Sequence, residues 1–184
     1  MALVEITTVA HHVEIDLAYA GFENFTGAPI YTQAICYLHP EAEKLLVRAR
    51  ELAAVQGLKL KIFDAFRPVE AQWALWNHTP NPDYIADPRR GSPHSRGVAI
   101  DLTLLDSSGR ELEMGTPFDD LTLQSHHGSM AVSATAQKNR ASLLGLMTAA
   151  GWDFFRNEWW HYQLFDSRQY PTISDSALPK AMMA

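Results

Sequence analysis

The sequence has a single cysteine among its 184 residues, no long apolar run, and fewer basic than acidic side chains. One cysteine excludes an intramolecular disulfide, so nothing marks an oxidising compartment. The lack of about 18 consecutive apolar residues argues against a membrane-spanning helix. With 15 Lys and Arg against 21 Asp and Glu, the formal charge of −6 disfavours nucleic acid or an anionic membrane as a partner.

The N-terminal segment does not have the pattern of a secretory signal. "MALVEITTVAHHVEID" contains no basic segment, and Glu5 interrupts its apolar residues. We therefore expect a cytoplasmic protein. The length and the 47% hydrophobic content are typical of one folded domain with its own core, over residues 1–184. The tail, from about 171 to 184, has little periodicity and is expected to be loosely held.

Helical and extended patterns are interspersed along the chain, which predicts an α+β fold with a small, mainly antiparallel sheet flanked by helices. Apolar residues recur at three-and-four spacing over 40–56, and a second helix is expected over 134–150 between a Ser133 cap and Gly151. Residues 58–63 alternate apolar and basic side chains, as a half-buried strand does. Pro68 then opens a short helix.

Two further pairs of strands are expected in the second half of the chain. Residues 98–104, "VAIDLTL", precede the turn "DSSG" and the segment "RELEM", which together indicate a hairpin. "WDFFR" and "WWHYQL" indicate another pair of strands joined by a short turn. The polar stretch 77–97 is rich in proline and glycine, and a loop of this length in a compact domain is usually functional or disordered.

Candidate metal ligands lie on these strands and on the loop before them. Asp101 shares the small, polar face of its strand with Ala99 and Thr103, and His161 shares a face with Gln163. His94 arrives from the glycine-containing loop. Catalytic zinc sites take three ligands from His, Asp or Glu and keep a fourth position open. We therefore expect His94, Asp101 and His161 to form such a site on the face of the sheet.

Two other residues have the chemistry that such a site requires. Glu158 lies three residues before His161 and is the candidate general base. In a straight strand that spacing puts the two side chains on opposite faces, so Glu158 must stand on a turn or a bulge. Arg67 precedes Pro68 at a strand-to-helix junction, where it would face a developing oxyanion.

Each of these residues also has a purely structural interpretation. His94 could be a solvated loop residue, and Asp101 a hydrogen-bonded structural carboxylate. His161 could be a core histidine with satisfied hydrogen bonds, Glu158 a turn residue, and Arg67 a partner of Asp64. The adjacent pair His126-His127 is a rival metal site, but side chains at neighbouring positions diverge, so we expect a structural role for both. From these patterns alone, a zinc hydrolase is a hypothesis.

A family resemblance strengthens that hypothesis. "SPHSRGVAIDLTL" together with "EWWHY" resembles the paired signatures of the LAS-type zinc D,D-peptidases, and is most similar to the D-alanyl-D-alanine dipeptidases, the VanX-type enzymes. The likeness extends over roughly residues 13–165 and includes "DLAYAGFENFTGAPIY", "DAFRP", "MGTPFDDLTLQSHH" and "QKNRASLLGLM". Two departures are Pro93, where relatives often have a small polar residue, and a shorter loop over 77–93.

The resemblance implies a single-zinc dipeptidase that hydrolyses D-alanyl-D-alanine to two D-alanine molecules. One Zn²⁺ per chain would be bound by His94, Asp101 and His161, with Glu158 as the base and Arg67 stabilising the transition state. It further implies a pocket for the dipeptide that is lined by Tyr19, Ser92 and Asp119. In this pocket Asp119 would pair with the free ammonium group of the dipeptide.

Two alternatives stay open at this point. One is another peptidase on the same scaffold, either a D,D-carboxypeptidase or a murein endopeptidase. The other is a zinc-stabilised binding module without catalysis, which Glu158 disfavours because a structural zinc needs no base beside it.

Overall fold

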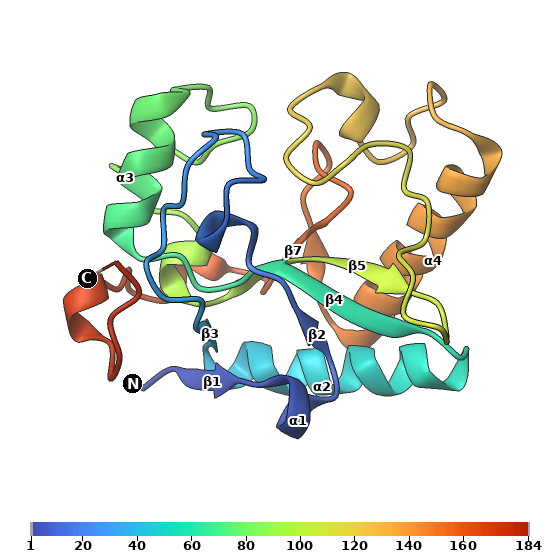
Figure 1. Ribbon diagram of the computed structural model, residues 1–184, viewed down its shortest axis with the longest axis horizontal. Helices are drawn as coiled ribbons and strands as arrows, with labels where there is room; N and C mark the ends of the chain where they lie inside the picture. The colour runs from blue at the N-terminus through green and yellow to red at the C-terminus, as the bar shows by residue number, and fades with distance from the viewer. Residues whose placement is uncertain (1, 184) are drawn as a thin grey trace.

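The computed structural model describes residues 2–183, and its central element is a five-stranded sheet in the order β2-β4-β5-β7-β6 (Figure 1). β2 pairs with β4 in parallel, and the other neighbouring strands are antiparallel. A second sheet pairs β1 (Val4–Ile6) with β3 (Cys36–Leu38). The α+β class and the mainly antiparallel sheet are confirmed. The strands of the main sheet are β2 (Glu14–Ile15), β4 (Lys59–Asp64), β5 (Ala99–Leu105), β6 (Asp153–Phe154) and β7 (His161–Gln163).

The three longer helices, α2, α3 and α4, form where the sequence predicts them. Ser133 caps α4, since its hydroxyl accepts from the Ala136 N–H at 3.0 Å, and Gly151 ends the helix with a φ of 106°. The α-helices are α1 (Thr8–His11), α2 (Pro40–Val55), α3 (Val69–His78) and α4 (Ala134–Ala150). Short 3₁₀ helices are η1 (Ala18–Ala20), η2 (His94–Arg96), η3 (Leu123–Ser125), η4 (Ser167–Gln169) and η5 (Asp175–Ala177).

The two faces of the main sheet have different neighbours. α2 runs beneath the sheet in Figure 1 and contacts both β4 and α4. Ile100 and Leu102 of β5 are buried in the same hydrophobic core as Leu46 of α2. α3 and the long connecting segments lie above the sheet. Because side chains alternate along a strand, Asp101 faces this upper side, away from the core between the sheet and α2.

The predicted hairpin after β5 forms, but it is short. An isolated antiparallel bridge joins Leu105 to Glu111, and backbone hydrogen bonds of 2.8 and 2.9 Å flank it on either side. The pairing ends there, because the next two carbonyl groups bond to α4: Glu113 C=O accepts from Asn139 at 2.9 Å, and Met114 C=O accepts from Arg140 at 2.6 Å. Tertiary hydrogen bonds to a distant helix therefore limit the length of the hairpin.

The C-terminal tail is more firmly bound than the loose tail that we expected. Met182 is fully buried, and its N–H donates to Asp175 Oδ1 at 2.7 Å. The Ile173 N–H donates to the Ser95 carbonyl at 2.8 Å, next to His94. The tail thus packs against η2, and its lack of periodicity reflects an irregular path along the surface of the fold.

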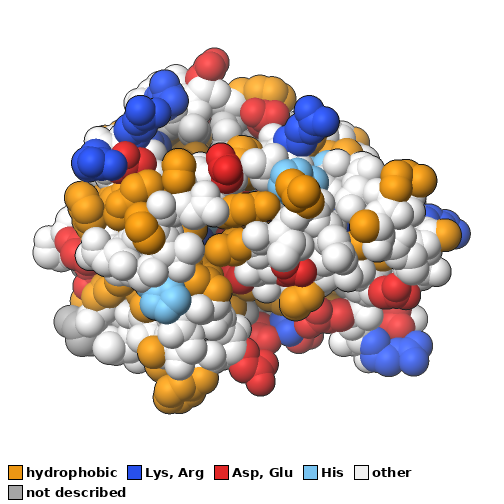
Figure 2. Space-filling view, turned by 90° about the horizontal axis from the view of Figure 1, so that it is seen from above, with side chains coloured by type: hydrophobic (Ala, Val, Ile, Leu, Met, Phe, Trp, Pro, Cys, Tyr) orange, Lys and Arg blue, Asp and Glu red, His pale blue; other side chains and the backbone are white. Residues whose placement is uncertain are grey.

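Figure 2 shows the surface of the molecule from above, where hydrophobic side chains gather across the middle and Lys and Arg side chains lie toward the edges. Within residues 2–183, none of the helices has the length and apolar character needed to cross a bilayer.

Candidate metal centre and active site

Three potential metal ligands converge on the upper face of the sheet. Asp101 of β5 and His161 of β7 are directly opposite each other in the antiparallel ladder. His94 belongs to η2, which Gly97 ends with a φ of 70° and so turns the chain into β5. All three side chains are buried, and one ligand atom from each lies within 4.8 Å of the other two.

The distances within this group match the needs of a small cation. His161 Nδ1 lies 3.0 Å from Asp101 Oδ1, while His94 Nε2 lies 3.1 Å from His161 Nδ1 and 3.3 Å from Asp101 Oδ2. A tetrahedral zinc with bonds of about 2.0–2.1 Å holds its ligand atoms about 3.3 Å apart. The observed spacing therefore fits the ion that the sequence predicts.

The outer nitrogens of the two rings fix which nitrogen faces the centre. His94 Nδ1 lies 2.6 Å from the Ala65 carbonyl, which only accepts, so Nδ1 carries the proton and Nε2 presents its lone pair. His161 Nε2 lies 3.1 Å from Gln163 Oε1, which favours the proton on Nε2 and the lone pair on Nδ1. Two lone pairs and a carboxylate at these distances repel one another unless a cation lies between them.

Asp101 is held in its ionised form. Burial by itself would raise the pKa of this carboxyl, but positive charge on the His94 and His161 rings holds the pKa well below its usual range, and a bound cation would act in the same direction. Its Oδ2 also lies 3.7 Å from Arg67 Nη2. An anionic ligand is therefore ready beside the two imidazoles.

Glu158 meets the geometric requirement stated from the sequence. It precedes β7 in a turn, with the Glu158 N–H donating to the Phe155 carbonyl at 3.3 Å. Its Oε2 lies 3.9 Å from His161 Nδ1, so the turn brings it to the same side as the ligand. Burial raises the pKa of Glu158 to about 8. A positive charge at the ligand cluster would favour the ionised form.

Arg67 has the structural partner that the sequence left open. Its Nε and Nη2 donate to Asp64 Oδ2 at 2.9 and 2.8 Å, so the structural ion pair exists. Its Nη1 donates to Gln72 Oε1 at 3.0 Å, and the Gln72 amide donates onward to the Ala86 carbonyl. These bonds hold the guanidinium in the wall of the cavity, and its catalytic role stays a prediction.

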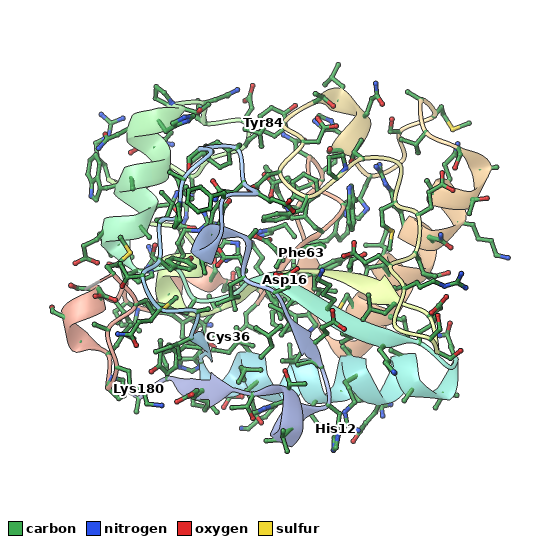
Figure 3. All side chains as sticks on the ribbon, viewed as in Figure 1. His12, Asp16, Cys36, Phe63, Tyr84 and Lys180 are labelled. Atoms are coloured by element: carbon green, nitrogen blue, oxygen red, sulfur yellow. The ribbon has the colours of Figure 1, made fainter. Side chains whose placement is uncertain are left out.

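A cavity of about 380 Å³ opens above the ligand cluster, within the usual range for a small-molecule site. Its lining includes the three predicted substrate-binding residues, Tyr19, Ser92 and Asp119. Tyr84, labelled among the upper loops in Figure 3, lines it as well. Loops from widely separated parts of the chain therefore line one cavity, and the three candidate metal ligands lie at its floor.

Asp119 contributes a half-buried carboxyl group to this lining. Its Oδ1 accepts from the Tyr19 hydroxyl at 3.1 Å, whereas its Oδ2 is buried without a hydrogen-bond partner among the described residues. Burial raises the pKa of Asp119 well above its ordinary value. A carboxylate oxygen in such a place is suited to a cationic group of a ligand. Ser92 has a different part, since its hydroxyl accepts from the His94 N–H at 3.2 Å.

The rival pair His126-His127 does not join the ligand cluster. His126 Nε2 lies 3.4 Å from the Tyr84 hydroxyl. The His127 ring packs against Phe154 and Tyr162, and burial lowers its pKa to about 4. The two rings therefore have different neighbours, as the divergence of adjacent side chains requires.

Two supporting residues, Gln163 and Gln72, are not predicted from the sequence. Gln163 lies two positions after His161 on the same strand face, and that spacing was a usable signal. Gln72 lies on α3, one helical turn after Pro68, but nothing local shows that it bonds to Arg67.

Replacing Gln163 with leucine should weaken zinc binding by about 10- to 100-fold, because the His161 ring loses the acceptor that fixes its tautomer. Competition with a chromophoric chelator measures the Kd. Gln169→Leu, an exposed change on η4, is the matched control and should bind zinc like the unchanged protein. An unchanged Kd in Gln163→Leu would show that the hydrogen bond does not orient the ligand.

Comparison with known proteins gives one consistent result. The profile of the peptidase M15 family, described as D-ala-D-ala dipeptidase, matches residues 1–178. The D-alanyl-D-alanine dipeptidase of Escherichia coli (strain K12) is 43% identical over 173 residues, which cover 94% of this chain and 90% of that protein. The D-alanyl-D-alanine dipeptidase of Enterococcus faecium is 38% identical over 186 residues, covering 89% and 91%.

One solved structure is also similar. It is a vancomycin resistance D,D-pentapeptidase, VanY, from a VanB-type resistance cassette in complex with Zn(II), with a TM-score of 0.47 and 13% identity. The match covers 72% of this chain and 75% of that one.

Proposed function

The chain belongs to the D-ala-D-ala dipeptidase family of M15 peptidases, and we propose that it is a zinc-dependent dipeptidase that hydrolyses D-alanyl-D-alanine to two D-alanine molecules. The observation that carries this proposal is one cavity with a three-ligand cluster on its floor and two further carboxyl groups in its lining, the buried Glu158 and the half-buried Asp119. Glu158 acts in the chemistry, and Asp119 binds the substrate.

His94, Asp101 and His161 hold one zinc ion per chain. Three protein ligands leave a coordination position free, which is the arrangement of catalytic rather than structural zinc sites. When bound, zinc supplies Lewis-acid chemistry, since it acidifies a water molecule and polarises a carbonyl group.

Glu158 moves the proton during hydrolysis. Its carboxylate takes a proton from the attacking water as the water oxygen bonds to the peptide carbon, and it returns the proton to the leaving nitrogen as the C–N bond breaks. Burial and the turn before β7 hold this carboxylate on the same side as His161. Arg67 donates to the carbonyl oxygen as negative charge develops there, because Asp64 and Gln72 fix its position.

Asp119 selects the substrate. Its free Oδ2 accepts from the ammonium group of the dipeptide, while the Tyr19 hydroxyl keeps the carboxylate oriented through Oδ1. Ser92 supports the pocket through its bond to the His94 backbone. With a free dipeptide as the substrate, we place the activity in the cytoplasm, and the single buried Cys36 is compatible with that reducing compartment.

Free D-alanyl-D-alanine and its N-acetyl derivative should differ in kcat/KM by about 100-fold or more. The acetyl group removes the positive charge and leaves the Asp119 carboxylate without its partner, a loss that typically costs about 2–5 kcal/mol. Measuring the release of D-alanine from both substrates under the same conditions gives the ratio.

Asp119→Asn is the matched variant for this comparison. It keeps an acceptor for the Tyr19 hydroxyl but removes the charge, so it should raise KM for the free dipeptide and reduce the ratio. Equal turnover of both substrates by the unchanged protein would contradict the dipeptidase and favour a D,D-carboxypeptidase. Zinc binding without turnover of either would favour a binding module.

A further inference from the structure

A buried arginine outside the ligand cluster holds the segment that carries Asp119. Arg140 of α4 is 4% exposed, and neutral oxygens of that segment surround its guanidinium. Its Nε donates to the Met114 carbonyl at 2.6 Å and its Nη1 to the Gln124 carbonyl at 2.7 Å. Its Nη2 donates to the Thr116 hydroxyl at 3.1 Å. The guanidinium group of Arg140 therefore bonds to both ends of segment 114–124 and holds them against α4.

The Thr116 hydroxyl connects this segment to the turn that carries Glu158. Besides the bond from Arg140, it accepts from Trp159 Nε1 at 2.9 Å. Both nitrogens are donors only, so they occupy the two acceptor sites of the hydroxyl. The Thr116 proton must therefore point to Ser125 Oγ, which lies 3.0 Å away. Ser125 Oγ–H in turn donates to the Asp120 carbonyl at 2.5 Å.

Both ends of this hydrogen-bond chain lie beside proposed active-site groups. Trp159 directly follows Glu158, and its backbone N–H also donates to the Ser125 carbonyl at 3.0 Å. Asp120 directly follows Asp119, whose φ of 61° is uncommon for a residue with a side chain. A backbone in that conformation persists only where its surroundings hold it.

We propose that Thr116, clamped by Arg140, is a positioning residue that sets Asp119 and Glu158 at a fixed separation and so aligns the bound dipeptide for attack. This inference rests on the proposed function, in which Asp119 anchors the ammonium and Glu158 is the base. The hydroxyl touches neither group. It acts through Trp159 on one side and through Ser125 and Asp120 on the other.

Thr116→Val tests the proposal, because valine has the shape of threonine without the hydroxyl. We expect kcat per bound zinc to fall by about 10- to 100-fold with KM changed less than about threefold, since the anchor remains but the carbonyl is misaligned. Thr116→Ser keeps the hydroxyl and should stay within about threefold of the unchanged protein. The measurements are D-alanine release from D-alanyl-D-alanine, zinc content and thermal unfolding.

Ser133→Ala separates positioning from stability. It removes the N-cap of the same helix and the bond from Ser133 to the exposed Glu113 side chain, but none of the hydrogen bonds of the Thr116 network. It should therefore lower Tm while leaving kcat and KM unchanged. If Thr116→Val does not fold, Ser125→Ala breaks the chain at its other end and should lower kcat in the same way.

Two failures can be told apart. An unchanged protein that does not cleave D-alanyl-D-alanine would overturn the proposed function. An active protein whose Thr116→Val and Ser125→Ala variants retain full kcat would overturn the positioning role alone. The positioning role would also be overturned if Ser133→Ala, with the same loss of Tm, lowered kcat as much as Thr116→Val does.

Discussion

Replacing Glu158 with glutamine is expected to lower kcat for D-alanyl-D-alanine by about 10²- to 10⁴-fold while leaving one zinc ion per chain. The amide has nearly the size of the carboxylate but cannot take a proton, and general-base catalysis is typically worth that factor. Glu158 lies outside the three-ligand cluster, so the metal should remain. Steady-state kinetics together with elemental analysis of the purified variant measure both quantities.

The matched control is Glu14→Gln, the same chemical change at an exposed position of β2. It should leave kcat and zinc content unchanged. A normal kcat in zinc-loaded Glu158→Gln would remove Glu158 from the mechanism. A variant that lost its zinc would instead show that Glu158 supports the ligand cluster.

The ionisation of Glu158 would connect the proposed base to the metal. Burial raises the pKa of this carboxyl to about 8, which favours the protonated form near neutral pH when no cation is nearby. A positive charge beside His161 would favour the carboxylate form. We therefore expect zinc binding to favour the form of Glu158 that can accept a proton.

The strand patterns predicted the strand face on which each of two candidate ligands lies, but not that the two strands are neighbours. Alternation along β5 and β7 puts Asp101 and His161 each on the polar face of its own strand, and this follows from the sequence. That the two strands are neighbours, with these two residues in direct register, depends on contacts 60 residues apart in the chain. The family resemblance supplied that pairing, because its signatures treat the two motifs as one site.

The support around the site could not be predicted for the same reason. Tyr31 bonds to Asp64 at 2.8 Å, and Arg140 bonds to Met114, although neither pair has any local pattern that joins its members. The predicted hairpin stays short at the same segment, because Asn139 and Arg140 bond to the carbonyl groups of Glu113 and Met114. Local periodicity predicts elements, whereas long-range hydrogen bonds between polar groups decide what irregular segments do.

His161→Ala should abolish both zinc binding and turnover, which sets it apart from Glu158→Gln. The remaining His94 and Asp101 are two ligands, fewer than a catalytic zinc site uses. Zinc should also stabilise the unchanged protein, by about 4 kcal/mol when the free ion is about 1,000 times its Kd, and this gain should be absent from the variant. Thermal unfolding with and without zinc, beside a direct titration, measures the effect.

His126→Ala is the control that separates the two histidine groups. Its ring contacts Tyr84 and lies outside the cluster, so the variant should bind zinc with the same Kd and gain the same stability. Chelation of the unchanged protein should reproduce the His161→Ala result, and added zinc should reverse it. If His126→Ala lost zinc and His161→Ala kept it, the ligand set would be wrong. If both variants kept their zinc, the metal would bind elsewhere in the protein. The loss of activity in Glu158→Gln would then need an explanation that does not place a metal beside Glu158.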